Sequence, residues 1–167
     1  QRRRQRQMCI RDSFPTVVYP NPEEAEALTL ALAKAKELDA DLVMATDPDT
    51  DRVGIALKNH HNEWQLVNGN QTGALLVHYL IDALKKADKL EDAHYVVKTI
   101  VTTELIDTMA ASYGVDCFNT LTGFKHIASI IRELEGKRKF IGGGEESYGY
   151  MIGDFVRDKD AVASCAF

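Results

Sequence analysis

The sequence contains few cysteines and no long apolar run. Its three cysteines stand at positions 9, 117 and 165, without the CxxC spacing of zinc sites and redox motifs. This usage is typical of a reducing compartment, and it predicts neither a disulfide framework nor a structural zinc ion. No stretch approaches the roughly 20 apolar residues that a membrane-spanning helix requires. We therefore expect a cytoplasmic protein without a membrane partner.

The balance of residue types is that of a folded protein. Of the 167 residues, 45% are apolar and 27% are charged, and the formal net charge is −5. This composition disfavours a disordered chain. The length allows one ordinary domain or two small ones.

Basic residues are concentrated at the beginning of the chain, where residues 1–13 hold five arginines and one acidic residue. Such a segment is compatible with a nucleic-acid-binding arm or a transit peptide. A simpler interpretation exists, because residues 3–13 (RRQRQMCIRDS) match the in-frame translation of a common transposase-type sequencing adapter. We favour this interpretation, exclude residues 1–13 from the fold, and expect no nucleic-acid partner.

From residue 14 onward, β-branched runs alternate with helical periodicity. The pattern predicts strands at residues 16–19, 41–46, 53–57, 64–67, 94–99, 116–119 and 139–141. It predicts helices at residues 22–38, 69–86, 103–113, 122–135 and from 158 onward. The polar segment 86–93 separates two parts, 14–90 and 91–167. Alternation of this kind indicates two α/β domains with mixed, largely parallel sheets, with residues 64–67 as a hairpin partner.

An acidic loop follows the strand predicted at residues 41–46. Residues 47–52 read DPDTDR, so Asp47, Asp49 and Asp51 stand at alternate positions of a tight turn. Three carboxylates turned toward one point supply the oxygen ligands that Mg²⁺ prefers, and a neighbouring Arg52 suits phosphate. Since α/β proteins bind ligands at the carboxyl ends of their strands, we favour a metal site over a solvated acidic turn.

A phosphatase of the haloacid dehalogenase type is a second interpretation of this loop. That class places DxDx[TV] after a strand, and a pattern starting at Asp47 requires Thr or Val where this chain has Asp51. A start at Asp49 reaches Val53 but moves the nucleophile two residues beyond the strand. The pattern therefore disfavours a phosphatase.

A glycine-rich loop follows the last predicted strand, where residues 142–149 read GGGEESYG. Glu145 and Ser147 are two residues apart in an extended segment, so their side chains point the same way. A carboxylate beside a hydroxyl suits adjacent sugar hydroxyls. Two acidic residues and the absence of a GxGxxG pattern disfavour a nucleotide site. Taken alone, the loop is also compatible with an exposed glycine turn.

Taken in order, the segments DPDTDR, TLTGFKHI, GGGEESYGY and VRDKDA resemble the α-D-phosphohexomutase family, and most of all its phosphoglucomutase/phosphopentomutase-like branch. The resemblance covers about residues 14–167, with Pro48 where many members have glycine. It implies a fragment of a four-domain enzyme. Residues 14–90 would be the later part of domain 2 and residues 91–167 most of domain 3, without domains 1 and 4 of the parent chain.

The same resemblance implies roles for individual residues. The metal ligands for Mg²⁺ would be Asp47, Asp49 and Asp51. The catalytic residues would be Arg52, Lys98 and Lys159. The substrate-binding residues would be Thr122, Gly123, Lys125, Glu145, Ser147 and Arg157.

The activity that the resemblance implies is the interconversion of a hexose 1-phosphate and a hexose 6-phosphate through a phosphoserine. Glucose 1,6-bisphosphate would be the intermediate and activator. Phosphopentomutase and phosphomannomutase stay open as alternatives within the family, and a non-catalytic metal and sugar-phosphate binding module stays open outside it. No serine in residues 14–167 stands in the family's phosphoserine loop, so we expect this chain alone to be inactive.

Overall fold

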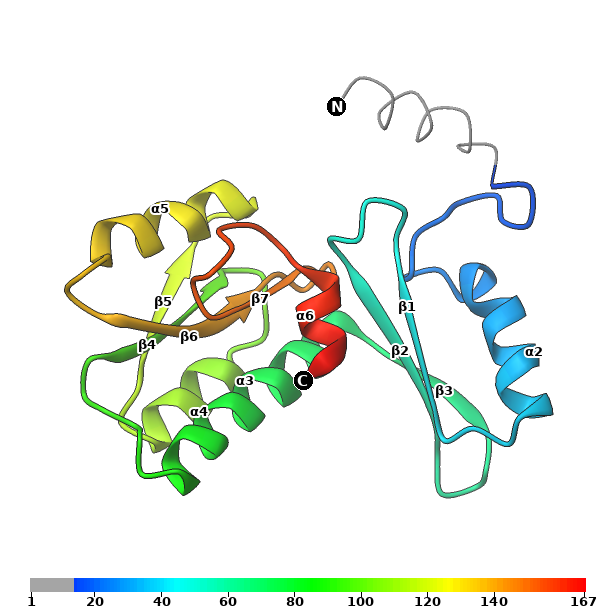
Figure 1. Ribbon diagram of the computed structural model, residues 1–167, viewed down its shortest axis with the longest axis horizontal. Coiled ribbons are helices and arrows are strands. Elements are labelled where there is room, and N and C mark those ends of the chain that lie inside the picture. The colour runs from blue at the N-terminus through cyan, green and yellow to red at the C-terminus, as the bar shows by residue number, and fades with distance from the viewer. Residues whose placement is uncertain (1–13) are drawn as a thin grey trace.

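The computed structural model describes residues 14–167, which form two packed units (Figure 1). The interpretation of residues 1–13 as translated adapter lies outside the described residues and stays a hypothesis. Each unit is built on its own sheet, and the last helix of the chain lies between the two sheets. Across residues 14–167, no helix combines the length and the apolar character that crossing a membrane demands.

The first unit is a three-stranded sheet with helical turns against one face. Its strands, in sheet order, are β1 (Leu42–Thr46), β2 (Val53–Lys58) and β3 (Trp64–Val67). Its helical segments are the 3-10 turn η1 (Ala25–Leu28) and the helix α2 (Thr29–Glu37). Leu28 and Ala35 pack on Val43 and Ala56 to form the core of this unit.

Both pairings in the first sheet are antiparallel, which corrects our expectation of a largely parallel sheet in this half. Thr46 of β1 lies opposite Val53 of β2 across a loop of six residues. Parallel neighbours need a crossover of about a dozen residues or more, so a loop this short can only join antiparallel strands. The hairpin expected for residues 64–67 is confirmed.

Two further expectations for the beginning of the described chain are wrong. Residues 16–19 form turns and bends instead of a strand, and Val18 is 86% exposed, because no strand of the described residues pairs with them. The helix expected from residue 22 begins later, at Ala25. The Asn21 side chain accepts a hydrogen bond from the Glu23 N–H at 3.1 Å, which closes a turn where a helix cap was expected.

The second unit is a four-stranded mixed sheet. Its strands are β4 (His94–Thr99), β5 (Asp116–Thr120), β6 (Lys139–Gly144) and β7 (Tyr150–Ile152). Its helices are α3 (Gly69–Lys86), α4 (Leu105–Ser112), α5 (Phe124–Leu134) and α6 (Ala161–Ala166). The sheet order is β5-β4-β6-β7, with the first three strands parallel and β7 antiparallel beside β6. The sequence patterns missed β7, which is only three residues long.

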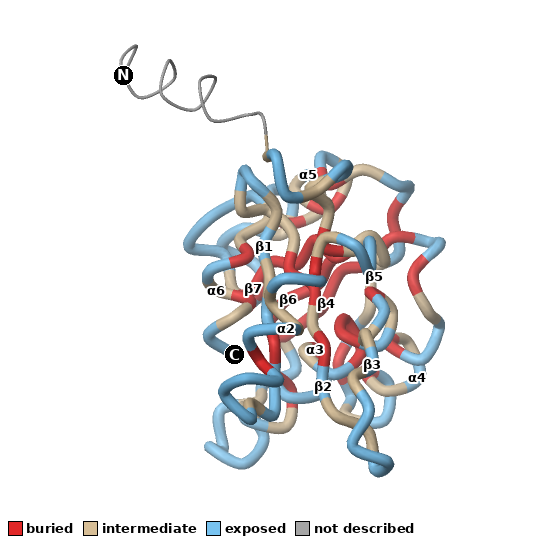
Figure 2. Tube along the Cα trace, turned by 90° about the vertical axis from the view of Figure 1, so that its right-hand side faces the viewer, coloured by how far each residue is buried: buried red, intermediate tan, exposed pale blue. Residues whose placement is uncertain are grey.

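Helices cover both faces of the second sheet. On one face, α3 and α4 pack on Val96 and Ile141, and on the other, α5 packs on Tyr95 and Val97. The buried residues concentrate along the central strands, and the exposed ones lie at the periphery (Figure 2). This layering confirms the expected α/β fold with mixed sheets, which are partly rather than largely parallel.

Helix α3 packs on the second sheet, although the sequence pattern grouped it with the first part of the chain. Ile81 is fully buried against Val96 and Ile141. The helix starts at a capping box, in which the Asn68 side chain accepts from the Gln71 N–H and Gln71 accepts from the Asn68 N–H. We therefore propose that the second unit begins near residue 68, before the polar segment 86–93.

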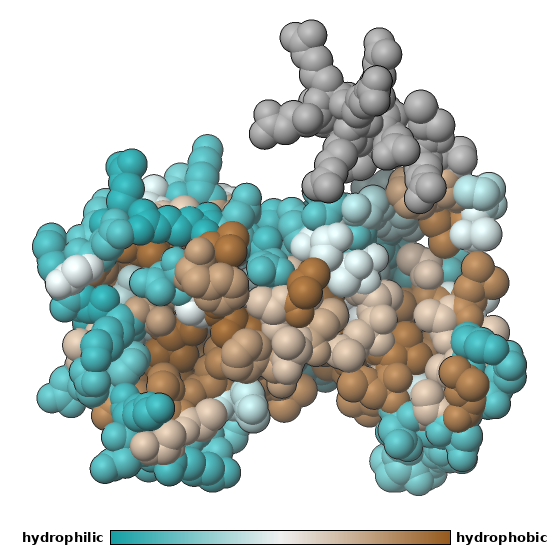
Figure 3. Space-filling model, in the orientation of Figure 1, coloured by the Kyte–Doolittle hydropathy of each residue, from teal (hydrophilic) through white to brown (hydrophobic). Residues whose placement is uncertain are grey.

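The two units meet in a small apolar junction. Val53 of β2, Tyr150 of β7 and Ala161 of α6 form a buried cluster there. Apolar side chains also gather on the surface over the middle of the face shown in Figure 3. The exposed apolar residues of the second unit include Leu75 of α3 and Phe167.

We predict that Ile81→Ala lowers the free energy of unfolding by about 2–5 kcal/mol, because it leaves a cavity between α3 and the second sheet. Leu75→Ala is the matched control on the same helix, because Leu75 is 62% exposed. We expect it to change the free energy of unfolding by about 0.5 kcal/mol or less. Urea unfolding followed by circular dichroism measures both. Equal losses for the two variants would contradict this packing.

Candidate functional site

The acidic loop between β1 and β2 is held in shape by its first aspartate. Asp47 Oδ1 accepts hydrogen bonds from the backbone N–H groups of Asp51 at 2.9 Å and Arg52 at 3.0 Å. Thr50, with a φ of 63°, donates its N–H to the Asp47 carbonyl at 3.1 Å. The Asp47 side chain is only 9% exposed. The loop is therefore a fixed turn that is closed by its own carboxylate.

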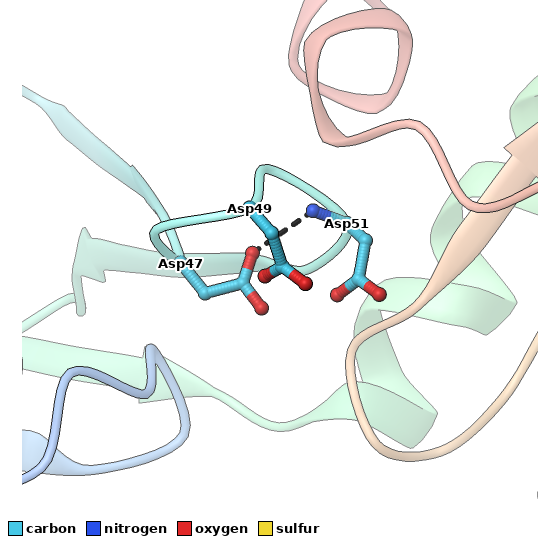
Figure 4. Close-up of side chains that lie close together, drawn as sticks. All are labelled: Asp47, Asp49 and Asp51. Atoms are coloured by element: carbon cyan, nitrogen blue, oxygen red, sulfur yellow. Dashed lines mark hydrogen bonds between the residues drawn. The ribbon is translucent and has the colours of Figure 1, made fainter. Parts of the chain in front are cut away.

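The three carboxylates of this turn gather at one point. One oxygen from each of Asp47, Asp49 and Asp51 lies within 4.8 Å of the others, and Figure 4 shows the side chains turned to the same side of the loop. Hard divalent cations take carboxylate oxygens, and Mg²⁺ commonly binds one or two carboxylates together with water and phosphate. The donor set therefore fits a divalent cation with coordination positions left for other ligands.

Two basic side chains lie beside the acidic turn. Arg52 Nε is 3.8 Å from both Asp47 Oδ2 and Asp51 Oδ1, and Arg52 also approaches Glu23 at 3.5 Å. Lys159 Nζ is 2.6 Å from Asp51 Oδ2. Lys159 precedes α6, so a residue more than 100 positions later in the sequence pairs with the acidic loop.

The carboxylates around Lys159 hold its ammonium in the charged form. Burial alone lowers the pKa of Lys159, but the hydrogen bond to Asp51 and the charges of Asp51, Glu145 and Asp158 outweigh it. The net result is a pKa above the ordinary value for lysine. The site therefore contains a permanent cation between two acidic segments.

Gly142, Gly143 and Gly144 of the glycine-rich loop belong to β6, and the rest of the loop, residues 145–149, makes a turn. This corrects our expectation of an extended segment at Glu145 and Ser147. The turn lies beside the acidic one. Tyr148 of the loop accepts a hydrogen bond at its carbonyl from the Val53 N–H at 3.1 Å, just after the acidic turn. Glu145 Oε1 accepts from the Gly123 N–H at 3.0 Å, which brings residues 122–125 to the same place. Gly123 has a φ of 108°, a conformation that favours glycine.

Most of the residues expected at the site are thus brought together. Asp51 is paired with Lys159, and Glu145 is bonded to Gly123. Ser147 follows in the same loop and is half-buried, while Thr122 and Lys125 flank Gly123 and are exposed.

The remaining two expected site residues are engaged elsewhere. Lys98 is buried and pairs with Asp107 Oδ2 at 2.9 Å and the Thr102 carbonyl at 3.1 Å. Arg157 pairs with Glu135 after α5, and both side chains are exposed. Their assignments as catalytic and substrate-binding residues stay predictions.

Glu146 makes a contact that holds the glycine-rich loop in place, and the sequence pattern missed it. Its Oε2 accepts hydrogen bonds from the hydroxyls of Thr99 at 3.1 Å and Thr102 at 3.3 Å. Glu146 therefore ties the glycine-rich loop to the end of β4, while Glu145 bonds on the other side to Gly123. No local pattern signals this contact, because residues 146 and 147 form a turn and Thr99 and Thr102 lie more than 40 positions earlier in the sequence.

The sequence profile described as "Phosphoglucomutase/phosphomannomutase, alpha/beta/alpha domain III" matches residues 68–167. The profile described as domain II of the same proteins matches residues 4–61, which includes part of the segment interpreted as adapter. The domain III match begins at Asn68, the residue that caps α3.

Named relatives show the same likeness. The chain is 42% identical over 150 residues to a Schizosaccharomyces pombe protein named "Probable phosphoribomutase". The matched region covers 89% of this chain and 25% of that protein. It is 41% identical over 150 residues to a phosphoglucomutase of Staphylococcus haemolyticus, covering 90% of this chain and 27% of that one. The chain therefore spans about a quarter of the length of these curated relatives.

The fold also occurs in solved structures. A phosphoglucomutase/phosphomannomutase family protein from Burkholderia thailandensis superposes with a TM-score of 0.68 at 20% identity, over 89% of this chain and 29% of that one. At this identity the likeness speaks for the fold alone.

We predict that Asp107→Asn destabilises the fold by about 2–4 kcal/mol, because it leaves the nearly buried Lys98 ammonium without a counter-charge. Asp116→Asn is the control, since Asp116 pairs with Arg138 in an exposed position and should contribute about 1 kcal/mol or less. Urea unfolding of the three proteins measures the difference, and equal effects would contradict it.

The Asp107 effect should depend on pH. Burial raises the pKa of Asp107, but hydrogen bonds from Asn119 and Lys98 lower it further, so its net pKa lies below the ordinary value. A depressed carboxyl pKa stabilises the fold above the unfolded value of about 4 and ceases to do so as the pH falls through the folded value. We therefore expect the gap between wild type and D107N to close in acid. A gap that grows in acid would contradict the pairing.

Proposed function

The chain belongs to the phosphoglucomutase/phosphomannomutase family, the α-D-phosphohexomutases, and we propose that it is the metal-binding and sugar-binding part of a phosphosugar mutase. The observation that carries this proposal is the meeting of two loops. The acidic turn with Asp51 and the glycine-rich loop with Glu145 come from different sheets, and Lys159 lies between them. Each loop alone has a simpler explanation, but their contact creates one polar site.

The metal proposed for the acidic turn is Mg²⁺, held by Asp47, Asp49 and Asp51. The mutual approach of their oxygens and the fixed Asp47 side chain support this choice. A bound Mg²⁺ would neutralise charge on phosphoryl oxygens during transfer. Arg52 and Lys159 would add positive charge on the protein side, and phosphoryl transfer depends on such charge.

The glycine-rich loop is proposed to bind the hydroxyls of the sugar. Glu145 uses Oε1 for the Gly123 N–H, which fixes the carboxylate and leaves its second oxygen to accept from a hydroxyl. Ser147 in the same loop can both donate and accept. Thr122, Lys125 and Arg157 would contribute at the edge of the site, as the family resemblance implies. The arrangement suits a sugar held by hydroxyl groups, with its phosphate directed toward the cations.

We propose a hexose phosphate as the substrate and glucose 1,6-bisphosphate as the intermediate, formed by exchange of a phosphoryl group with a phosphoserine outside this chain. Relatives named for glucose and for ribose phosphates are nearly equally similar to this chain, so a pentose phosphate is the second candidate within the family. A mannose phosphate is a third candidate. The rival from another class is a metal and sugar-phosphate binding module without catalysis.

We expect the wild-type chain to bind one Mg²⁺ and Asp49→Asn to weaken that binding at least about tenfold, because one of three anionic ligands is lost. Asp49 is exposed, so the variant should fold normally. Asp39→Asn is the control, since Asp39 pairs with Lys58 in the first unit and is not part of the turn. Calorimetric titration measures the affinities. Binding of Mg²⁺ that is equal in wild type and D49N would contradict the proposed site.

We also expect the 167-residue chain alone to show no mutase turnover. Its serines beyond residue 13 are Ser112, Ser129, Ser147 and Ser164, and none stands in a phosphoserine loop of the family type. A coupled assay that reduces NADP⁺ as glucose 6-phosphate forms measures the conversion of glucose 1-phosphate, with glucose 1,6-bisphosphate present. Turnover by the purified chain, lost in D49N, would show that the phosphoryl carrier lies within these residues.

A further inference from the structure

Lys159 occupies a position between the two loops of the proposed site. Its Nζ is 2.6 Å from Asp51 Oδ2 and lies 5.7 Å from the centre of the Phe124 ring. Its side chain is 19% exposed. A Cβ atom at position 149 would lie 2.5 Å from Lys159 Cδ, so the stem of the lysine runs over Gly149. A side chain at position 149 would overlap the path that the Lys159 stem takes to the acidic turn.

Asp51 has a cationic neighbour at each of its carboxylate oxygens. Oδ2 is bonded to Lys159, and Oδ1 lies 3.8 Å from Arg52 Nε. A divalent cation that binds Asp51 must therefore compete with a basic side chain at whichever oxygen it takes. Like charges this close repel strongly in a partly buried site.

Lysine is the side chain of the two that can move aside. Arg52 is fixed by Asp47, Asp51 and Glu23. Lys159 is a point charge on a flexible stem, and lysine ammonium groups reorient easily. A second carboxylate, that of Glu145, lies near the stem of Lys159. The Cβ position at Gly149, which lies 2.5 Å from Lys159 Cδ, is 3.6 Å from Glu145 Oε2.

We propose that Lys159 and a divalent cation compete for Asp51, so that binding of the metal moves Lys159 from the acidic turn toward Glu145 of the glycine-rich loop. The inference rests on the metal site proposed for the acidic turn. Its consequence is a coupling between the two loops. A cation that binds the acidic turn brings Lys159 closer to Glu145 of the glycine-rich loop. By reciprocity, a ligand that holds Lys159 at Glu145 strengthens metal binding by the same factor.

The test is a calorimetric Mg²⁺ titration of three folded proteins. Lys159→Met removes the competing charge, and we expect it to bind Mg²⁺ about tenfold more tightly than wild type, within the usual range of coupling between sites. Lys58→Met is the matched control. Lys58 also bonds an aspartate, Asp39, at 2.7 Å, is 18% exposed and lies 5.8 Å from the ring of Trp64, but belongs to the far end of β2. We expect K58M to bind Mg²⁺ as wild type does.

Gly149→Ala tests the same idea without removing a charge. The added methyl group displaces the Lys159 stem, so we expect tighter Mg²⁺ binding here as well, by a smaller factor than in K159M. Amide spectra provide an independent readout. In wild type, Mg²⁺ should shift the Gly123 amide, whose proton is bonded to Glu145, and this shift should be strongly reduced in K159M.

The outcomes separate this inference from the proposed function. If wild type binds no Mg²⁺ at the acidic turn, the proposed metal site itself is wrong. If wild type binds Mg²⁺ and K159M and G149A bind it equally or more weakly, the competition is wrong and Lys159 instead supports Asp51. Tighter binding in both variants, with K58M unchanged, supports the competition.

Discussion

Two backbone hydrogen bonds hold the acidic turn against the second unit, and the proposed site depends on them. The Val53 N–H bonds to the Tyr148 carbonyl, and the Ala161 N–H bonds to the Thr50 carbonyl, both at 3.1 Å. The two donors, Val53 and Ala161, also belong to the buried cluster that contains Tyr150. Without this junction, the carboxylates and the glycine-rich loop would be separate surface features. With it, the acidic turn lies beside the glycine-rich loop, and Lys159 pairs with Asp51 between them.

The convergence of the carboxylates in the acidic turn could be predicted because its signal is local. Alternate aspartates after a strand indicate carboxylates that converge, and Asp47, Asp49 and Asp51 do converge. The shared direction expected for Glu145 and Ser147 assumed an extended segment, and the structure has a turn there instead. The helix at residues 69–86 was equally clear, because its periodicity extends over five turns and begins at a strong cap. Such features need no knowledge of the rest of the fold.

The parts that could not be predicted depend on distant partners. The β-branched run 16–19 has strand propensity but pairs with no strand among residues 14–167. The strands of the first sheet are antiparallel because their connection is short. The pairing of Lys159 with Asp51 joins residues from two units, and the contact of Glu146 with Thr99 crosses from one loop to another. Lys98 stands at the strand end where it was expected, but Asp107 on the next helix decides where its charge is directed.

Paramagnetic Mn²⁺ in place of Mg²⁺ tests the central claim most directly, because it broadens the amide signals of all nearby residues. If the two loops form one metal site, substoichiometric Mn²⁺ should broaden the amides of the acidic turn and also those of Glu145 and Tyr148. The turn at residues 59–62, at the far end of the first sheet, should stay sharp. Broadening confined to the acidic turn, or centred elsewhere, would contradict the claim that the two loops share one site.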